Sequence, residues 1–416
     1  MKLAFVGVSI YANTGYGRMT REITSRLIEK YDVLAIGQED THVWGSDLSY
    51  RTPTGKVVPN LPIGDPFSSG GLLREYCNEY GVDVLVGHWD VWVLGMLKKP
   101  GRPYCLYVPI DAPLTPRWMK HMEGATKIIA YSLFGLSELA KYFPGSQVTY
   151  IPHGVDCATF KPLEKSKAEL RKNPPVKLNA PIPEDAFLMM TAQANVGPRK
   201  QLPLLLKTFR RFAQRHENAH LYLHSNAQSD SPQGYDLVDL CDQFGINDRV
   251  HFPKITPIIV PATDEQLNEL FNAADVYVSN SLGEGFGLPV LESMAAGVPA
   301  IAPANSSHVE LVKSRGWLCD CVPTDIYADY PVYVPTLQEF PIPNQRSMLE
   351  KMEEAYAADR GPIGSSAREF ALGYDWSKVM PKWFRLFDEL GEEIQLFKET
   401  RASLEVGPGQ VPPTKA

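Results

Sequence analysis

A strand, a glycine-rich loop and a helix follow one another between residues 274 and 302, and this unit constrains the fold more than any other stretch. Residues 274–278 (Ala-Asp-Val-Tyr-Val) are β-branched and aromatic, which predicts a buried strand. Three glycines follow at alternate positions: Gly283, Gly285 and Gly287. Pro289 suits the first turn of a helix, because its φ is already helical and its missing N–H would have no partner there. Gly297 predicts the end of that helix.

Two carboxylates frame this unit. Glu284 lies in the loop and Glu292 on the predicted helix, with seven residues between them. A helix N-terminus presents free backbone N–H groups and a positive dipole end, so the unit predicts an anion site. Carboxylates beside an anion repel it unless they bind another group, and sugar hydroxyls are the obvious partners. The alternative is that Glu284 caps the helix with its side chain and Glu292 is an exposed helix residue.

Residues 284–292 (Glu-Gly-Phe-Gly-Leu-Pro-Val-Leu-Glu), with 273–275 before them and 295–299 after them, resemble the signature of glycosyltransferase family 4. Members of that family are retaining, nucleotide-sugar-dependent enzymes. The resemblance extends to about Leu390 and implies the GT-B fold: two Rossmann-like, doubly wound α/β domains that face a cleft, with a C-terminal helix returning to the first domain. It implies a glycosyltransferase (EC 2.4, a hexosyltransferase) that moves a sugar from a UDP- or GDP-sugar to a glycan, lipid or small-molecule acceptor.

The same resemblance implies roles for single residues. It places Glu284 at the transferred sugar and Glu292 at the nucleotide ribose. It assigns phosphate and sugar binding to the backbone between them, that is, to Gly285, Phe286, Gly287 and Leu288. The implied mechanism is a front-face one, in which the leaving phosphate helps to deprotonate the acceptor and no side chain acts as a nucleophile. No Asp-x-Asp sequence lies near a predicted strand end, so we expect no required metal or cofactor.

A second strand, loop and helix open the chain. Residues 2–8 predict a buried strand, and residues 19–28 carry apolar side chains at helical spacing. Between them lie Gly15, Tyr16 and Gly17, without the third glycine of a dinucleotide-binding fingerprint. An ordinary strand-to-helix turn explains this loop equally well. The family resemblance implies that the loop approaches the donor diphosphate, which makes all three residues donor-binding candidates.

Two further predicted strands lead to polar residues at the same sheet edge. One is followed by His88 and Trp89, the other by Asp111. Because the carboxyl ends of parallel strands meet at one edge, these side chains are expected to face the cleft. His88 and Trp89 are candidates for contact with the acceptor, although His88 could equally be a structural histidine. Asp111 is a catalytic candidate at a position where many members of the family have a histidine, so the acceptor chemistry stays open.

A basic pair, Arg199 and Lys200, follows the first predicted strand of the second domain at a glycine-containing turn. Positive charge at a helix N-terminus opposes the helix dipole. This favours a catalytic role, the neutralisation of a diphosphate leaving group, over an ordinary basic helix start. The family usually has an arginine near Asn195; here Asn195 is a donor-binding candidate and Arg199 a candidate substitute. Pro253 ends another strand, where members of the family hold the nucleobase.

The length of 416 residues exceeds what one core usually supports and predicts two domains. The expected divisions are 1–150 for an N-terminal Rossmann-like acceptor domain, 151–180 for an interdomain linker, 181–373 for a Rossmann-like donor domain, 374–400 for a helix crossing back to the first domain, and 401–416 for a disordered tail.

The net charge and the cysteine pattern further narrow the classes of protein to which this chain could belong. The formal net charge of −7 gives no electrostatic indication of nucleic-acid binding. Six cysteines without a framework spacing favour reduced thiols. The chain opens on a predicted strand and has no apolar run long enough to span a bilayer, so we expect no signal peptide and no transmembrane segment. The expected location is the cytoplasm, either free or peripheral at the inner membrane face.

Two other function classes stay open at this point. A non-catalytic sugar-nucleotide-binding protein could keep the same fold, because a fold does not establish chemistry. A Rossmann oxidoreductase is less favoured, since the glycine fingerprint is incomplete. Donor turnover distinguishes the first from an enzyme, and NAD(P) binding tests the second.

Overall fold

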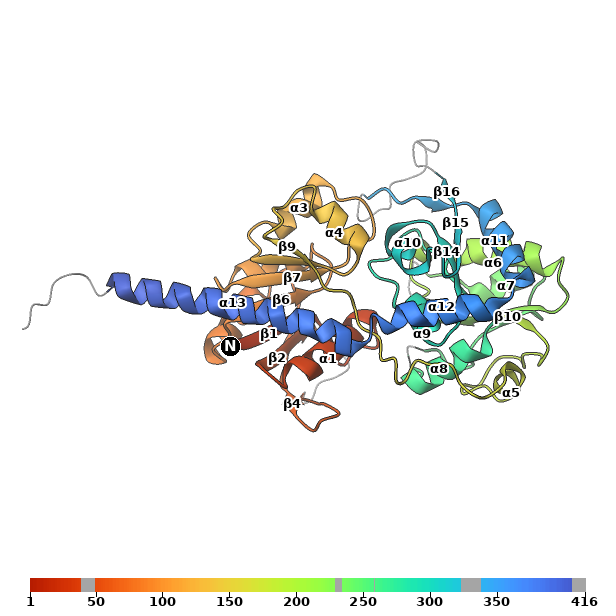
Figure 1. Ribbon diagram of the computed structural model, residues 1–416, viewed down its shortest axis with the longest axis horizontal. Helices are drawn as coiled ribbons and strands as arrows, with labels where there is room; N and C mark the ends of the chain where they lie inside the picture. Colours follow the sequence, from red (N-terminus) through yellow and green to blue (C-terminus); the bar gives the residue numbers. More distant parts are fainter. Residues whose placement is uncertain (39–48, 229–233, 258, 323–337, 406–416) are drawn as a thin grey trace, which may run out of the picture.

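The computed structural model describes residues 1–38, 49–228, 234–257, 259–322 and 338–405. The chain forms two lobes that lie side by side, the N-terminal half in one and most of the C-terminal half in the other (Figure 1). Each lobe is built on a parallel sheet with helices around it. This arrangement confirms the predicted fold class, two doubly wound α/β domains.

The N-terminal domain contains, among the described residues, a seven-stranded parallel sheet. Its strands, in spatial order, are β5 (Asn60–Ile63), β2 (Asp32–Gln38), β1 (Lys2–Val8), β6 (Val84–His88), β7 (Tyr104–Val108), β8 (Lys127–Ala130) and β9 (Val148–Tyr150). The helical segments are α1 (Gly15–Leu27), α2 (Gly70–Glu79), α3 (Pro116–Met122), α4 (Leu133–Leu139) and a 3₁₀ turn at Leu94–Lys98, and a short hairpin pairs β3 (Tyr50–Arg51) with β4 (Val57–Val58). The central strands are buried on both faces, as parallel sheets between helices require.

The C-terminal domain repeats this plan with six parallel strands in its described part. Their order is β12 (Val250–His251), β11 (Ala219–His224), β10 (Phe187–Ala192), β13 (Val276–Val278), β14 (Ala300–Pro303) and β15 (Trp317–Cys319). The surrounding helices are α6 (Leu202–Ala213), α7 (Leu237–Phe244), α8 (Asp264–Ala273), α9 (Leu288–Ala295), α10 (Ser306–Val312), α11 (Gln345–Ala357) and α12 (Arg360–Leu372), and β16 (Cys321–Val322) pairs with β17 (Ile342–Pro343).

The chain crosses between the domains twice, and the crossings touch each other. Val155 forms an isolated parallel bridge with Asp375, and a Cβ at Gly154 would clash with the Trp376 ring. From there α13 (Trp376–Glu405) runs along the N-terminal lobe (Figure 1), where Trp383 is fully buried in the core that also holds β1. The predicted return of the C-terminal helix to the first domain is therefore confirmed.

Helix α13 is longer than the sequence analysis expected. The tail was expected to begin at residue 401, but residues 401–405 are helical, and 406–416 lie outside the described residues. The reason is that residues 392–405 contain no glycine or proline, and the first such residue is Gly407. The helix continues past the domain that it packs on (Figure 1).

The stretch expected to be a linker is folded onto the second domain. Within it, α5 (Lys167–Lys172) packs beside α8, and Arg171 is buried with its Nη2 donating to Asp275 Oδ2 at 2.7 Å. Leu178 forms an antiparallel bridge with Pro253. Its Lys- and Pro-rich composition predicted a linker, and the Arg171–Asp275 contact and the Leu178–Pro253 bridge attach part of this stretch to the second domain. The division at residues 151–180 stays a prediction.

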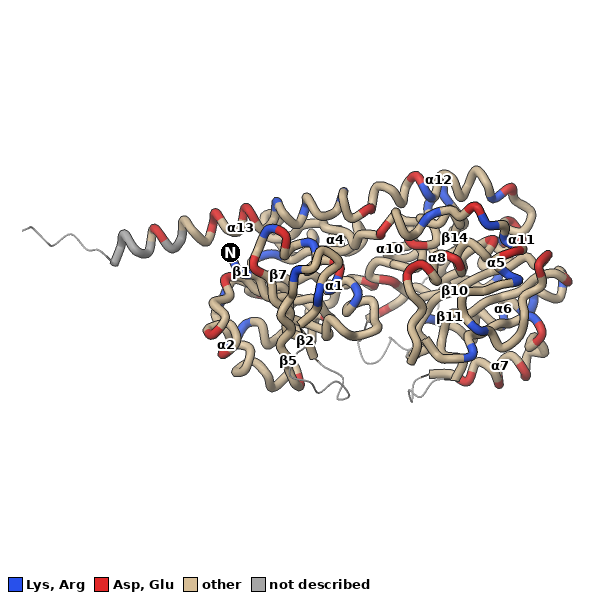
Figure 2. Tube along the Cα trace, turned by 90° about the horizontal axis from the view of Figure 1, so that it is seen from below, with Lys and Arg blue, Asp and Glu red and all other residues tan. Residues whose placement is uncertain are grey.

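Acidic and basic residues are interspersed over both lobes in the view of Figure 2. None of the helices in the described part of the chain combines the length and apolar character needed to cross a bilayer. In the same part, no group of three or more His, Cys, Asp or Glu side chains is arranged to hold a metal ion. The six cysteines are all unpaired thiols, five of them buried.

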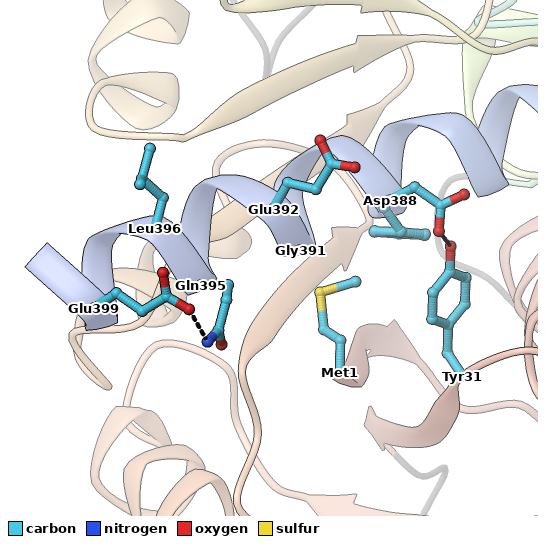
Figure 3. A pocket seen from close by; sticks show the side chains of 9 residues that line it. Met1, Tyr31, Asp388, Gly391, Glu392, Gln395, Leu396 and Glu399 are labelled. Atoms are coloured by element: carbon cyan, nitrogen blue, oxygen red, sulfur yellow. Dashed lines mark hydrogen bonds between the residues drawn. The ribbon is translucent and has the colours of Figure 1, made fainter.

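A shallow hollow of about 610 Å³ lies between α13 and the start of β1. Figure 3 shows its lining, in which Asp388, Glu392 and Glu399 project from one helix and Tyr31 donates to Asp388 at 2.7 Å. This hollow is lined only by residues near the two chain ends, away from the carboxyl edges of the sheets. Ligands of open α/β sheets bind at those edges, so the hollow is not the candidate site.

Candidate functional site

The loop between β13 and α9 presents bare backbone at the domain boundary. Gly287 caps α9 with a φ of +92°, which a side chain would strain, and no side-chain hydrogen bond caps this helix among the described residues. A Cβ at Gly285 would lie 2.6 Å from Pro109 of the N-terminal domain. The first N–H groups of α9 therefore have no helical partner, and the approach of the other domain requires glycine at this position. These features fit an anion site at this helix end, and the site itself stays a prediction.

Glu284 forms a buried ionic cluster with the basic pair. Its Oε1 accepts from Ser281 Oγ at 2.6 Å and from Lys200 Nζ, while Arg199 Nη1 lies 3.3 Å from Oε2. Burial raises the pKa of the Glu284 carboxyl, but Lys200 and Arg199 outweigh burial and hold that pKa well below its usual range. The side chain does not cap α9, since the cap is Gly287. The alternative interpretation of Glu284 is wrong.

Arg199 and Lys200 come from a 3₁₀ turn at Pro198–Lys200, and α6 begins only at Leu202. Arg199 Nη1 also donates to the Gly283 carbonyl at 2.6 Å and lies 3.7 Å from Asp111 Oδ2 of the other domain. Burial and the charge of Arg199 lower the pKa of Lys200. The cluster thus holds two basic side chains and a glutamate whose ionised form they favour, beside the bare end of α9. Arg199 brings Asp111 close to this cluster.

Glu292 is buried rather than exposed, and its partner is Arg18 of the N-terminal domain. Arg18 Nη1 donates to Glu292 Oε1 at 2.5 Å, and Nη2 donates to Asp264 Oδ2 at 3.1 Å. Burial raises the pKa of Glu292, and Arg18 opposes that rise. Arg18 is not among the site residues predicted from the sequence. A signal existed: the arginine lies in the first turn of α1, where its charge opposes the helix dipole.

Asp90 is a second residue that the sequence analysis missed. Tyr16 donates its hydroxyl to Asp90 Oδ1 at 2.9 Å, and burial raises the pKa of Asp90 to about 6. The nearby charge of Asp111 contributes to that rise. Two acids of the N-terminal domain therefore face the cation of Arg199. Asp90 directly follows the predicted site residues His88 and Trp89. A predicted cluster extended by one residue would have included it.

His88 lies inside the N-terminal domain, between the rings of Tyr16 and Tyr107. Its Nδ1 pairs with Thr20 Oγ1 at 3.0 Å, and burial lowers its pKa to about 3, so the ring is neutral. This environment favours the structural interpretation over contact with an acceptor. Trp89 packs against the hydrophobic core of the same domain. The acceptor role of both residues stays a prediction.

The remaining donor-binding candidates lie around the same boundary. Gly15, at the start of α1, faces Leu288 at the start of α9, where a Cβ on Gly15 would lie 3.9 Å from Leu288 Cδ1. Gly17 has no room for a side chain against the Ala12 carbonyl. Phe286 is buried against the His153 ring, with centroids 5.0 Å apart.

The side-chain amide of Asn195 forms hydrogen bonds with the protein backbone rather than facing an open ligand site. Its Nδ2 donates to the carbonyls of Asn226 and Tyr235, at 2.9 and 2.7 Å, and its Oδ1 accepts from the Tyr235 N–H. Pro253 follows β12 and is partly buried at its bridge with Leu178. The structure therefore brings Glu284, Arg199, Lys200 and Asp111 together, and keeps Asn195 and Pro253 outside that cluster. Their roles in binding a donor stay predictions.

Comparison with solved structures identifies the class of fold. Sucrose-phosphate synthase from Thermosynechococcus elongatus superposes with a TM-score of 0.72 at 16% identity, covering 94% of this chain and all of the other. Alr3699/HepE of Anabaena, solved in complex with UDP-glucose, gives a TM-score of 0.67 at 15% identity over 94% of this chain and all of the other. At these identities the likeness shows the fold alone, and that fold is GT-B.

Comparison of sequences identifies a family match over part of the chain. Residues 180–329 match the family described as Glycosyl transferases group 1. The D-inositol 3-phosphate glycosyltransferase of Arthrobacter sp. (strain FB24) is 25% identical over 271 residues, which cover 63% of this chain and 55% of the relative. O-antigen chain mannosyltransferase B of Escherichia coli is 40% identical over 76 residues, 18% of this chain and 19% of the relative. The chain thus spans about half, or less, of the length of these relatives.

Proposed function

We propose that this protein is a retaining glycosyltransferase that moves a hexose from a nucleoside-diphosphate sugar to an acceptor hydroxyl. The observation that carries the proposal is the bare N-terminus of α9 with Glu284, Arg199 and Lys200 clustered beside it. A binding site for a simple anion would not need a buried carboxylate next to its cations. A ligand with both a diphosphate and sugar hydroxyls uses all of these groups.

In this proposal each group has one task. The N–H groups of Gly285–Leu288 bind the diphosphate, and Arg199 and Lys200 neutralise the charge that develops on it as the sugar leaves. Glu284, kept ionised by the two cations, accepts hydrogen bonds from the sugar. Glu292 accepts from the ribose, with Arg18 shared between the ribose and the carboxylate.

The reaction then needs no protein nucleophile. The acceptor oxygen forms a bond to the anomeric carbon on the face that the leaving group departs from. The bond between that carbon and the phosphate oxygen breaks, and the acceptor proton passes to the released nucleoside diphosphate. The protein accelerates this step by positioning the two substrates and by stabilising the departing charge.

We also propose the division of labour between the domains: residues 1–150 serve the acceptor and 181–373 the donor. The contacts of Pro109 with Gly285 and of Arg18 with Glu292 support a site that is complete only when both domains meet. A UDP-sugar is the first donor to test, because the Anabaena neighbour was solved with UDP-glucose.

The experiment is a thermal-unfolding screen with UDP- and GDP-sugars, followed by measurement of nucleotide release for each one that binds. A true donor binds only the folded state and raises the unfolding temperature. The expected result is stabilisation by one nucleotide class and slow release of its diphosphate, both weakened in Lys200→Met. Stabilisation without any release over long incubation, with every acceptor class supplied, would favour the non-catalytic binder.

A further inference from the structure

A cavity of about 570 Å³ lies between the two domains next to the ionic cluster. Two of its lining residues contact the cluster of Glu284, Arg199 and Lys200. The Asp111 carboxylate lies 3.7 Å from Arg199, and Ser306 Oγ accepts the backbone N–H of Glu284 at 2.9 Å. The cavity therefore opens directly beside the proposed site of sugar transfer, and its volume is that of an ordinary small-molecule site.

Most of the cavity wall is apolar and comes from both domains. Leu133 and Phe134 begin α4 in the N-terminal domain, and Val309 lies on α10 in the C-terminal domain. Leu133 is 50% exposed and Val309 is 43% exposed, although α4 and α10 pack together across the domain boundary. Two large apolar side chains thus remain open to solvent inside a concave site, where burial by a ligand is favourable.

The two helices are held together at this cavity by a specific contact. The Leu133 N–H donates to Glu310 Oε2 at 2.6 Å, which links the start of α4 to α10. This hydrogen bond and the packing of α4 against α10 hold Leu133 and Val309 on opposite sides of the domain boundary. The apolar walls are a feature of the assembled cleft rather than of either domain alone.

We propose that this cavity binds the acceptor, and that the acceptor is an amphiphilic alcohol: a hydroxyl-bearing polar end at Asp111 and an apolar alkyl or aryl group between Leu133, Phe134 and Val309. The inference rests on the proposed function for the role of acceptor, and on the cavity for its chemistry. An acceptor that is polar throughout would leave the apolar walls in contact with water. Asp111 suits the polar end, because its carboxylate can accept a hydrogen bond from a hydroxyl.

Binding is tested first with a probe that does not depend on sugar transfer. The neutral dye N-phenyl-1-naphthylamine, whose fluorescence rises in apolar sites, is titrated into the full chain in the presence of UDP. The expected result is saturable binding that Val309→Asp weakens roughly tenfold or more, because the variant removes apolar contact and introduces a charge. The matched control is Val238→Asp, at a similarly exposed valine on α7, which should leave dye binding unchanged.

The chemistry of the ligand is tested by displacing the dye with n-alkyl β-D-glucopyranosides below their micelle concentrations, and with phenyl β-D-glucopyranoside. Butyl, hexyl and octyl glucosides should displace it with affinity rising roughly fourfold for each methylene that is buried. The phenyl compound distinguishes an aryl from an alkyl group. Methyl glucoside should not compete.

Three results would overturn the inference: no saturable dye binding, equal binding by Val309→Asp, or equal displacement by methyl and octyl glucoside. Thermal unfolding of each variant checks that it folds. The proposed function fails separately, through the absence of nucleotide release from any donor. Dye binding without donor turnover would support the apolar ligand site and refute the proposed sugar transfer. Donor turnover without dye binding would support sugar transfer and refute the apolar ligand site.

Discussion

Replacement of Lys200 by methionine tests the donor site at its most buried cation. Lys200 and Glu284 each expose only 14% of their side chains, and they pair directly. A hydrogen bond to a charged group contributes about 1.5–3 kcal/mol, and 1.4 kcal/mol is a factor of ten in affinity. Loss of the ammonium group should therefore weaken binding of the donor and of the free nucleoside diphosphate by roughly 10- to 100-fold. Methionine keeps the length and apolar contact of the lysine stem.

The assay is calorimetric titration with the nucleoside diphosphate, together with kcat/KM for the donor. Lys207→Met is the control, because Lys207 lies exposed on the neighbouring helix α6. The turnover number should fall as well as the affinity, since the cation stabilises charge that grows as the sugar leaves. Unchanged diphosphate affinity in a correctly folded Lys200→Met protein would refute the phosphate role.

Three further predictions follow from the contacts between the domains. Glu292→Gln should weaken diphosphate binding and relieve product inhibition, and unaltered product inhibition would show that the ribose assignment is wrong. Burial raises the pKa of Glu310 to about 7, so the folded state binds its proton more tightly than the unfolded state, and this contribution to stability is lost as pH rises from about 4.5 to 7. The stability of Glu310→Gln relative to the wild type should therefore rise by on the order of 1 kcal/mol between pH 5 and pH 8, as measured by thermal unfolding. A stability difference that does not change with pH would contradict this prediction. Nucleotide binding should protect residues 11–18 from hydrogen exchange and compact the chain in solution scattering; neither change in a protein that still turns over would mean that the cleft is closed beforehand.

Local sequence patterns predicted much of the fold. Alternating strands and helices, the glycine before a helix and Pro289 in its first turn are signals within a few residues, and the structure has β13, α9 and β14 where these signals place them. The exposed alternative for Glu292 failed because burial of this residue depends on Arg18, which is 274 positions away in sequence. Sequence periodicity does not report such pairings.

Contacts between residues far apart in the sequence also explain the other differences between the predictions and the structure. The segment before β10 has a linker-like composition, but Arg171 is fixed by Asp275, a residue 104 positions later. Asp90 becomes a candidate site residue only in the structure, because Tyr16 and Arg199 lie near it there. The apolar cavity could not be predicted, because Leu133 and Val309 are ordinary helix residues until two domains bring them together. Contacts between distant elements, rather than the elements themselves, were what the sequence left open.

The most direct test of the account follows the sugar itself. The donor found in the screen is incubated with wild type and with Glu284→Gln, and ¹H and ³¹P NMR monitor the anomeric configuration of the product and the release of nucleoside diphosphate. We expect release of one diphosphate for each sugar transferred, an anomeric configuration that matches the donor, and a rate reduced roughly 10- to 100-fold in Glu284→Gln. An inverted product, or a variant as active as the wild type, would contradict it.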